Sequence, residues 1–65
     1  RKSKKDFARF LLIAMGSTEE LRSQIRFARD TGLIKDSDFN SVHDKLLEIG
    51  KMITGLRKYL LSSAQ

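Results

Sequence analysis

Cysteine and proline are both missing from this chain of 65 residues, and its longest uninterrupted apolar run, residues 10–15, has only six side chains. Without cysteine, the fold cannot depend on disulfide bonds. The lack of cysteine fits a reducing cytoplasm, where we expect the protein to reside, although secreted helical proteins without cysteine also exist. A run of six is far below the ~18 residues of a membrane span and too short for a signal-peptide core. We therefore expect no membrane partner.

Side chains that commonly carry catalysis are also scarce. His43 is the only histidine, with Asp44 beside it but no second ligand at metal-binding spacing. No serine stands in a readable triad order with His43, and the glycines form no phosphate-binding loop. The sequence therefore predicts no enzymatic activity, no catalytic residue, no metal, no cofactor and no small-molecule substrate. His43 is interpreted as a surface or interface residue.

What the sequence does contain is two stripes of mostly apolar residues at alternating steps of three and four. Such spacing keeps one face of an α-helix apolar. The first stripe is Phe7, Leu11, Ala14, Thr18, Leu21, Ile25 and Ala28, and the second is Phe39, Val42, Leu46, Ile49, Ile53, Leu56 and Leu60. The stripes predict an all-α fold in which two long helices form an antiparallel hairpin.

The first helix has readable ends. Ser3 is a plausible N-cap, and Asp6 three residues later completes a pattern that resembles a capping box. Gly32 suits the left-handed residue that follows a helix. These signals predict a helix over about residues 4–31.

The second helix follows after a short connection at residues 32–35. Either Asp36 or Ser37 is suited to cap it, and acidic residues in its first turn favour the helix dipole. We expect this helix to cover about residues 36–61 and the last residues to fray. So short a loop makes the two helices antiparallel neighbours.

More apolar side chains are present than one helix–helix contact buries. A chain of this size is marginally stable by itself. We therefore expect the hairpin to be part of a bundle core with an oligomer contact, the alternative being a groove for a peptide or a lipid. The surplus residues are Phe10, Leu12, Ile13, Met15, Phe27, Leu47, Met52, Tyr59 and Leu61.

Three glycines, Gly16, Gly50 and Gly55, lie inside the predicted helices. Each destabilises a helix by roughly 1 kcal/mol relative to alanine. Such a loss is tolerated where two backbones approach closely, so we predict that all three are close-packing points between helices. A flexible hinge is the alternative.

Positive charge is concentrated at one end of the predicted hairpin. The net charge is +5, of which residues 1–9 contribute +4 and residues 51–65 contribute +3, while residues 36–50 contribute −3. Clustered lysine and arginine bind nucleic acid by releasing counterions, whereas the alternative is that the charge only maintains solubility. The candidate nucleic-acid-binding residues are Arg1, Lys2, Lys4, Lys5, Arg9, Lys51, Arg57 and Lys58 at that end, and Arg22, Arg26 and Arg29 in a basic strip on the first helix.

Three segments carry recognisable motifs: residues 3–21 (SKKDFARFLLIAMGSTEEL), 31–39 (TGLIKDSDF) and 46–56 (LLEIGKMITGL). Together they resemble the four-helix-bundle proteins encoded in 23S rRNA intervening sequences. The forms usual in that family are S-x-K-E-F-x-R-F-L-x-I-A-x-G-S-x-x-E-L, G-Y-L-x-x-x-x-F and L-x-x-x-G-x-M-L-x-G-L. Mild departures occur at Thr18, at Leu33 for the usual aromatic residue, and at Lys35, where the family often has a capping Ser or Thr.

The resemblance implies more than the hairpin. It implies that residues 1–65 are one partial domain, the C-terminal half of an up-down four-helix bundle, whose two upstream helices are absent from this chain. It further implies a ring-like homo-oligomer, typically a pentamer. Related accessory proteins of diversity-generating retroelements bind a reverse transcriptase and its RNA, which makes RNA or a ribonucleoprotein an expected partner.

Three functional hypotheses therefore stand. The first is a non-enzymatic oligomeric bundle protein that binds RNA or a nucleoprotein partner through basic patches. The second is a purely structural oligomerisation module. The third is an RNA-binding dimer of two hairpins that forms its own four-helix bundle, which would apply if 65 residues were the whole protein.

Overall fold

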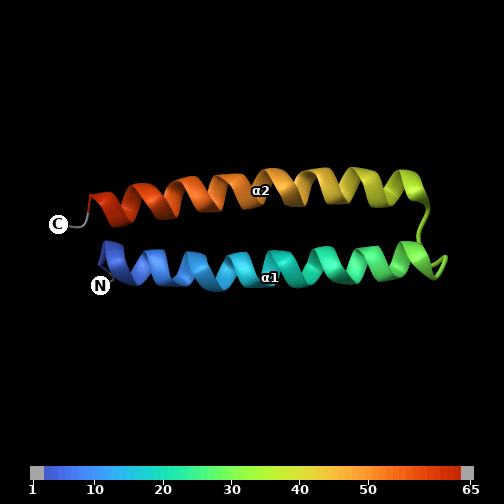
Figure 1. Cartoon of the computed structure of the whole chain (residues 1–65), viewed down its shortest axis with the longest axis horizontal. Coiled ribbons are helices and arrows are strands. Elements are labelled where there is room, and N and C mark those ends of the chain that lie inside the picture. Colours follow the sequence, from blue (N-terminus) through green and yellow to red (C-terminus); the bar gives the residue numbers. More distant parts are fainter. Residues whose placement is uncertain (1–2, 64–65) are drawn as a thin grey trace.

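The computed structural model describes residues 3–63, and within this range the chain forms two long helices joined by a short loop (Figure 1). α1 comprises Lys4–Asp30 and α2 comprises Asp36–Ser62. The helices lie side by side and antiparallel, so the start of α1 and the end of α2 share one end of a rod of 48 × 15 × 15 Å. The predicted all-α hairpin is confirmed, and both helices end within one residue of the predicted positions.

The capping box predicted at the start of α1 is present. The Ser3 hydroxyl accepts a hydrogen bond from the backbone N–H of Asp6 at 3.1 Å, and the Asp6 carboxylate accepts one from the backbone N–H of Ser3 at 3.4 Å. Both donors would otherwise lack an intrahelical partner. A purely local sequence signal therefore fixes where α1 begins.

Gly32 ends α1 through a Schellman motif. Its φ of +81° lies in the left-handed region that side chains other than glycine rarely adopt. This turn brings the Leu33 N–H to the Ala28 carbonyl at 2.8 Å and the Gly32 N–H to the Arg29 carbonyl at 3.0 Å. The chain reverses here within five residues, which makes α2 return along α1.

The predicted cap of α2 is wrong by one residue. Lys35, rather than Asp36 or Ser37, occupies the N-cap position, and its side chain makes no capping hydrogen bond. The helix begins earlier because the Phe39 N–H already bonds to the Lys35 carbonyl at 2.9 Å. Asp36 and Asp38 instead lie in the first turn, where their charge favours the helix dipole.

Neither helix has a stretch that is both long and apolar enough to cross a membrane, over the residues that the structure describes.

The left-handed turn makes a clear prediction. Replacing Gly32 with Ala should lower the free energy of unfolding by about 1–2 kcal/mol, because a Cβ is strained at positive φ. No atom lies within 4 Å of such a Cβ, so the backbone strain is the whole effect. Gly32→Asn should lose less, since asparagine tolerates this conformation. Urea unfolding at a fixed protein concentration measures both variants, and a Gly32→Ala variant as stable as the parent would contradict this role.

Candidate assembly face and basic end

The contact between α1 and α2 uses only part of each predicted stripe. Ala8, Phe39, Leu46 and Leu60 are the buried hydrophobic residues of the described range. Leu11, Thr18 and Ile25 of α1 are half-buried beside them, as is Ile53 of α2. Leu11, Thr18 and Ile25 recur every seven positions on α1, as do the four residues named on α2. Ala8, which lies outside the predicted stripe, is one helical turn before Leu11, so together these residues form one seam that runs the length of the rod.

On one side of this seam the structure leaves apolar side chains uncovered. Leu21, Val42, Ile49 and Leu56 lie three residues beyond seam positions, and Phe7 lies two heptads before Leu21 in the same row of α1. In an antiparallel pair of right-handed helices these rows fall on the same side. Each of these side chains is between 39% and 47% exposed. We call this surface the open face; its residues are Phe7, Leu21, Val42, Ile49 and Leu56.

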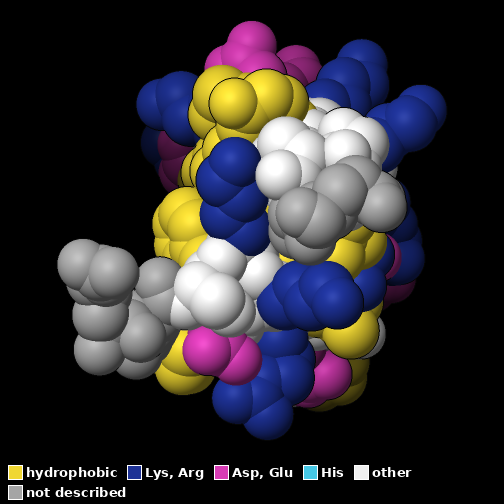
Figure 2. Space-filling view, turned by 90° about the vertical axis from the view of Figure 1, so that its left-hand side faces the viewer, with side chains coloured by type: hydrophobic (Ala, Val, Ile, Leu, Met, Phe, Trp, Pro, Cys, Tyr) yellow, Lys and Arg dark blue, Asp and Glu magenta, His cyan; other side chains and the backbone are white. Residues whose placement is uncertain are grey.

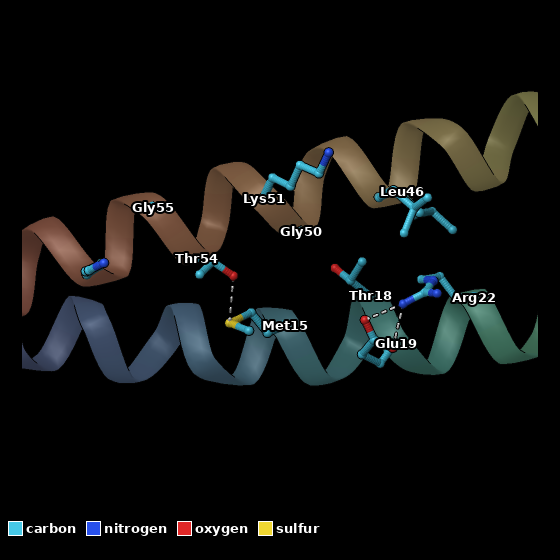
Figure 3. A pocket seen from close by; sticks show the side chains of 11 residues that line it. Met15, Thr18, Glu19, Arg22, Leu46, Gly50, Lys51, Thr54 and Gly55 are labelled. Carbon is cyan, nitrogen blue, oxygen red and sulfur yellow. Dashed lines mark hydrogen bonds and ion pairs between the residues drawn. The ribbon is translucent and has the colours of Figure 1, made fainter.

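The opposite side of the seam contains a groove between the helices (Figure 3). Two adjoining hollows of about 520 and 530 Å³ share Met15, Thr54 and Lys58 as lining residues. Gly50 and Thr54 leave room here because they place little or no side chain above α2. We call these two hollows together the groove; its remaining lining residues are Leu12, Thr18, Glu19, Arg22, Leu46, Leu47, Lys51, Gly55, Arg57, Leu61 and Ser62.

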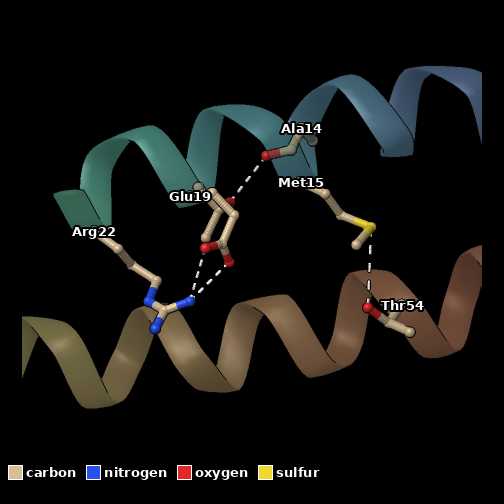
Figure 4. Close-up of polar contacts among 6 residues, drawn as sticks. Ala14, Met15, Glu19, Arg22 and Thr54 are labelled. Atoms are coloured by element: carbon tan, nitrogen blue, oxygen red, sulfur yellow. Dashed lines mark hydrogen bonds and ion pairs between the residues drawn. The ribbon is translucent and has the colours of Figure 1, made fainter.

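The groove holds weak polar links across and along the helices (Figure 4). The Thr54 hydroxyl donates to the Met15 sulfur at 3.9 Å, which joins α2 to α1. The Thr18 hydroxyl donates back to the Ala14 carbonyl at 2.9 Å, so this half-buried polar group is satisfied within its own helix. These contacts position the groove walls without filling the space between them.

The start of α1 and the end of α2 meet at the basic end of the rod, as the antiparallel arrangement predicts. Lys4 donates from Nζ to the Ser63 carbonyl at 3.3 Å and to the Ser63 hydroxyl at 3.2 Å. Lys5, Arg9 and Lys58 are exposed. Figure 2 shows lysine and arginine side chains spread over this end, with apolar side chains between them. Arg1 and Lys2, two further candidates, lie outside the described residues.

Arg57 has a structural contact that its sequence position did not suggest. Its Nε donates to the Ala8 carbonyl at 3.2 Å, across the seam from α2 to α1. The side chain is half-buried. The signal was available in the spacing, because Arg57 lies four residues beyond the seam residue Ile53 and therefore close to the helix–helix contact.

The three arginines of the predicted basic strip on α1 differ in their contacts and exposure. Arg22 donates from Nη1 to both Glu19 carboxylate oxygens at 2.8 Å. Arg29 pairs with Asp30 at 3.0 Å and lies 4.1 Å from the centre of the Phe39 ring. Both arginines are half-buried, whereas Arg26 is exposed. Lys51 is also exposed, but it lies over the groove rather than among the cations of the basic end.

His43 is half-buried and stacks on Phe39 with ring centroids 5.1 Å apart. Its Nε2 atom is buried without a hydrogen-bond partner. Over residues 3–63, no group of three or more His, Cys, Asp or Glu side chains is placed to hold a metal ion.

The helical glycines do not bring α1 and α2 together. A Cβ placed on Gly16, Gly50 or Gly55 would have no neighbouring atom within 4 Å. The hairpin itself therefore needs none of them to be glycine, and close packing at these positions stays a prediction about a helix outside this pair.

The comparisons with known proteins decide the family. A family model of the 23S rRNA-intervening sequence proteins matches residues 1–55, which includes all of α1, the loop and most of α2. The chain belongs to this family. No curated protein and no solved structure matches the sequence. The family name records where such proteins are encoded, so the role of this 23S rRNA-intervening sequence protein has to be argued from its surfaces.

The contact of Arg57 leads to a prediction about stability. Arg57→Met should lower the free energy of unfolding by about 1 kcal/mol, because a hydrogen bond from a cation across the seam is lost. Lys45→Met, which removes an exposed charge from α2, should change it by less than about 0.5 kcal/mol. Urea midpoints at equal protein concentration test the pair, and equal midpoints would show that the Arg57 contact adds no stability.

Proposed function

We propose that this family member is a non-enzymatic helical-bundle protein that assembles through its open face and binds RNA through its basic end. The observation that carries the proposal is the open face, five large apolar residues gathered on one side of the hairpin. The resemblance to the ring-like members of the family supports a homo-oligomer, typically a pentamer. The helices that cover the open face are either an upstream pair of the same protein or those of a second copy.

The energy at stake explains why the open face needs a cover. Fully burying one large aliphatic or aromatic side chain stabilises a protein by ~2 kcal/mol. Five side chains that are each about two-fifths exposed therefore leave roughly 4 kcal/mol of burial free energy unused. A whole small domain is stable by only about 5–15 kcal/mol. The burial free energy that an isolated hairpin lacks is thus comparable to the whole free energy of unfolding of a small domain.

Exposed cations at the basic end support RNA as the partner. Lys5 and Arg9 lie one helical turn apart on α1, and Lys58 belongs to the facing end of α2. Positive charge at a helix N-terminus opposes the helix dipole, so Lys5 does not serve helix stability. Contacts with RNA phosphates would account for these cations. Assembly repeats the basic end in every copy, which strengthens binding to one long RNA.

A purely structural module is the second candidate. It is favoured by the arginines, since Arg22, Arg29 and Arg57 all make contacts within the hairpin. On that view the exposed lysines only keep the assembly soluble. RNA binding separates the two candidates.

Assembly is tested first, with the full-length protein. Leu56→Glu places a charge in the open face and should lower either the molecular mass in light scattering or the thermal midpoint, because the buried carboxylate would lack a partner. Ser41→Glu adds the same charge at an exposed position of α2 and should change neither. If Leu56→Glu also changes neither, the open face is not covered in the native protein.

RNA binding is tested by salt titration. The logarithm of the affinity for single-stranded RNA should fall linearly with the logarithm of salt concentration, with a slope of about −0.7 for each phosphate neutralised. Replacing Lys5 and Arg9 with Gln should make that slope shallower by about 1.4. Replacing Lys35 and Lys45 with Gln removes the same charge away from the basic end and should leave the slope nearly unchanged. Absence of binding at ~50 mM salt would favour the structural module.

A further inference from the structure

The back of α1 carries a second row of exposed side chains that neither the seam nor the open face uses. Ile13, Glu20 and Phe27 recur at steps of seven, and each lies two residues beyond a seam residue. Two residues correspond to about 200° of helix rotation, so this outer row points away from α2. Ile13 is 60% exposed and Phe27 is 62% exposed. Neither value is typical of an apolar residue that serves a core.

The outer row has the form of a helix-packing surface. Small residues flank it, namely Gly16, Ser17 and Ser23, so another helix can come close to this face of α1. Glu20 lies midway between the two apolar residues, and its carboxylate accepts a hydrogen bond from Gln24 at 3.0 Å. The row therefore presents one apolar residue at either end and a negative charge at its centre.

The groove on the other side of the hairpin has the complementary form. Leu47 and Leu61 line its two ends, 14 residues or about 21 Å apart along α2. Lys51 and Lys58 stand between them, about 10 Å apart and exposed, while Met15 and Gly50 form part of the floor (Figure 3). The groove thus has apolar residues along its length and two exposed lysines around its middle. Arg22, which is paired with Glu19, and Arg57, which is bonded to the Ala8 carbonyl, also line it.

Length and charge match between the two surfaces. Ile13 and Phe27 are also 14 residues or about 21 Å apart. Seated in the groove, the outer row would put Glu20 between Lys51 and Lys58 and its apolar residues near Leu47 and Leu61. We propose that the outer row of one copy packs into the groove of a second copy. This inference rests on the homo-oligomer of the proposed function and names a contact that holds it together.

Such a contact is heterologous, because the surface that each copy gives differs from the surface that it receives. Heterologous contacts continue from copy to copy and end only when a ring closes. The contact also explains why glycine occurs at positions inside the helices where the α1–α2 contact does not require it. Gly16 beside the outer row and Gly50 in the groove floor let the two backbones approach, although neither has a neighbour within 4 Å inside one copy.

Two substitutions, one in each of the two surfaces, test the proposal in the full-length protein. Phe27→Glu spoils the outer row but leaves the groove intact, and Gly50→Leu fills the groove but leaves the row intact. With an upstream pair of the same protein covering the open face, each variant alone should lose higher assembly and have the mass of one copy by native mass spectrometry. Mixed in equal amounts, they should form a dimer of one copy of each variant and nothing larger, because one complementary pair of intact surfaces remains.

Charge reversal gives an independent readout. Glu20→Lys should disrupt assembly, and the double change Lys51→Glu with Lys58→Glu should do the same. A mixture of these two proteins should restore assembly beyond a pair, with the two variants alternating, because the new lysine meets the new glutamates and the unchanged Glu20 meets the unchanged lysines. Ser41→Glu and Ser41→Leu are the matched controls on an exposed part of α2, and both should assemble like the parent. Circular dichroism confirms that each variant remains helical.

Several results would overturn the contact. Full assembly of the Phe27→Glu or Gly50→Leu protein, or mixtures that stay at the mass of single copies, would each do so. If Leu56→Glu disrupts assembly while Phe27→Glu does not, the proposed function stands and this contact is wrong. If the parent protein is itself a single copy in solution, both the homo-oligomer and this contact fail.

Discussion

The limited surface that two helices share is the constraint on which this structure depends. An antiparallel pair buries one seam, here centred on Ala8, Phe39, Leu46 and Leu60. Every other apolar residue of the two stripes must be covered by something outside the pair or remain in water. The open face keeps apolar residues that the seam does not bury, while small residues on the other side leave space for the groove. The proposed assembly would thus follow from how the hairpin packs.

The parts of the structure that depend on local chemistry were predictable from the sequence. The capping box at Ser3 and the glycine turn at Gly32 involve residues within a few positions of each other, so their spacing alone identifies them. The start of α2 at residue 36 was predicted, but its N-cap was missed because Lys35 occupies that position without the side-chain chemistry of a cap. The seam was only partly predictable, since a seven-residue repeat does not tell which neighbouring row a partner helix will contact.

The positions of the charged residues were also only partly predictable from the sequence. A count of cations predicted the basic end, because an antiparallel hairpin must bring the start of its first helix beside the end of its second. Lys51, which the count placed at that end, lies over the groove instead. The count could not tell exposed lysines from arginines that contact the other helix, as Arg57 does through the Ala8 carbonyl. That distinction depends on the register between α1 and α2, which is a tertiary property. It leaves Lys5 and Arg9 as the cations best placed to meet phosphate, and assembly would bring several copies of them to one RNA.

The central claim is that other helices cover the open face in the native protein. Broadening of methyl NMR signals by a soluble paramagnetic probe, in the full-length protein, tests it most directly. The methyl groups of Val42, Ile49 and Leu56 should be protected, whereas those of Leu33, which is 73% exposed in the loop, should broaden strongly. Broadening of the open-face methyl groups to the same extent as those of Leu33 would contradict the account.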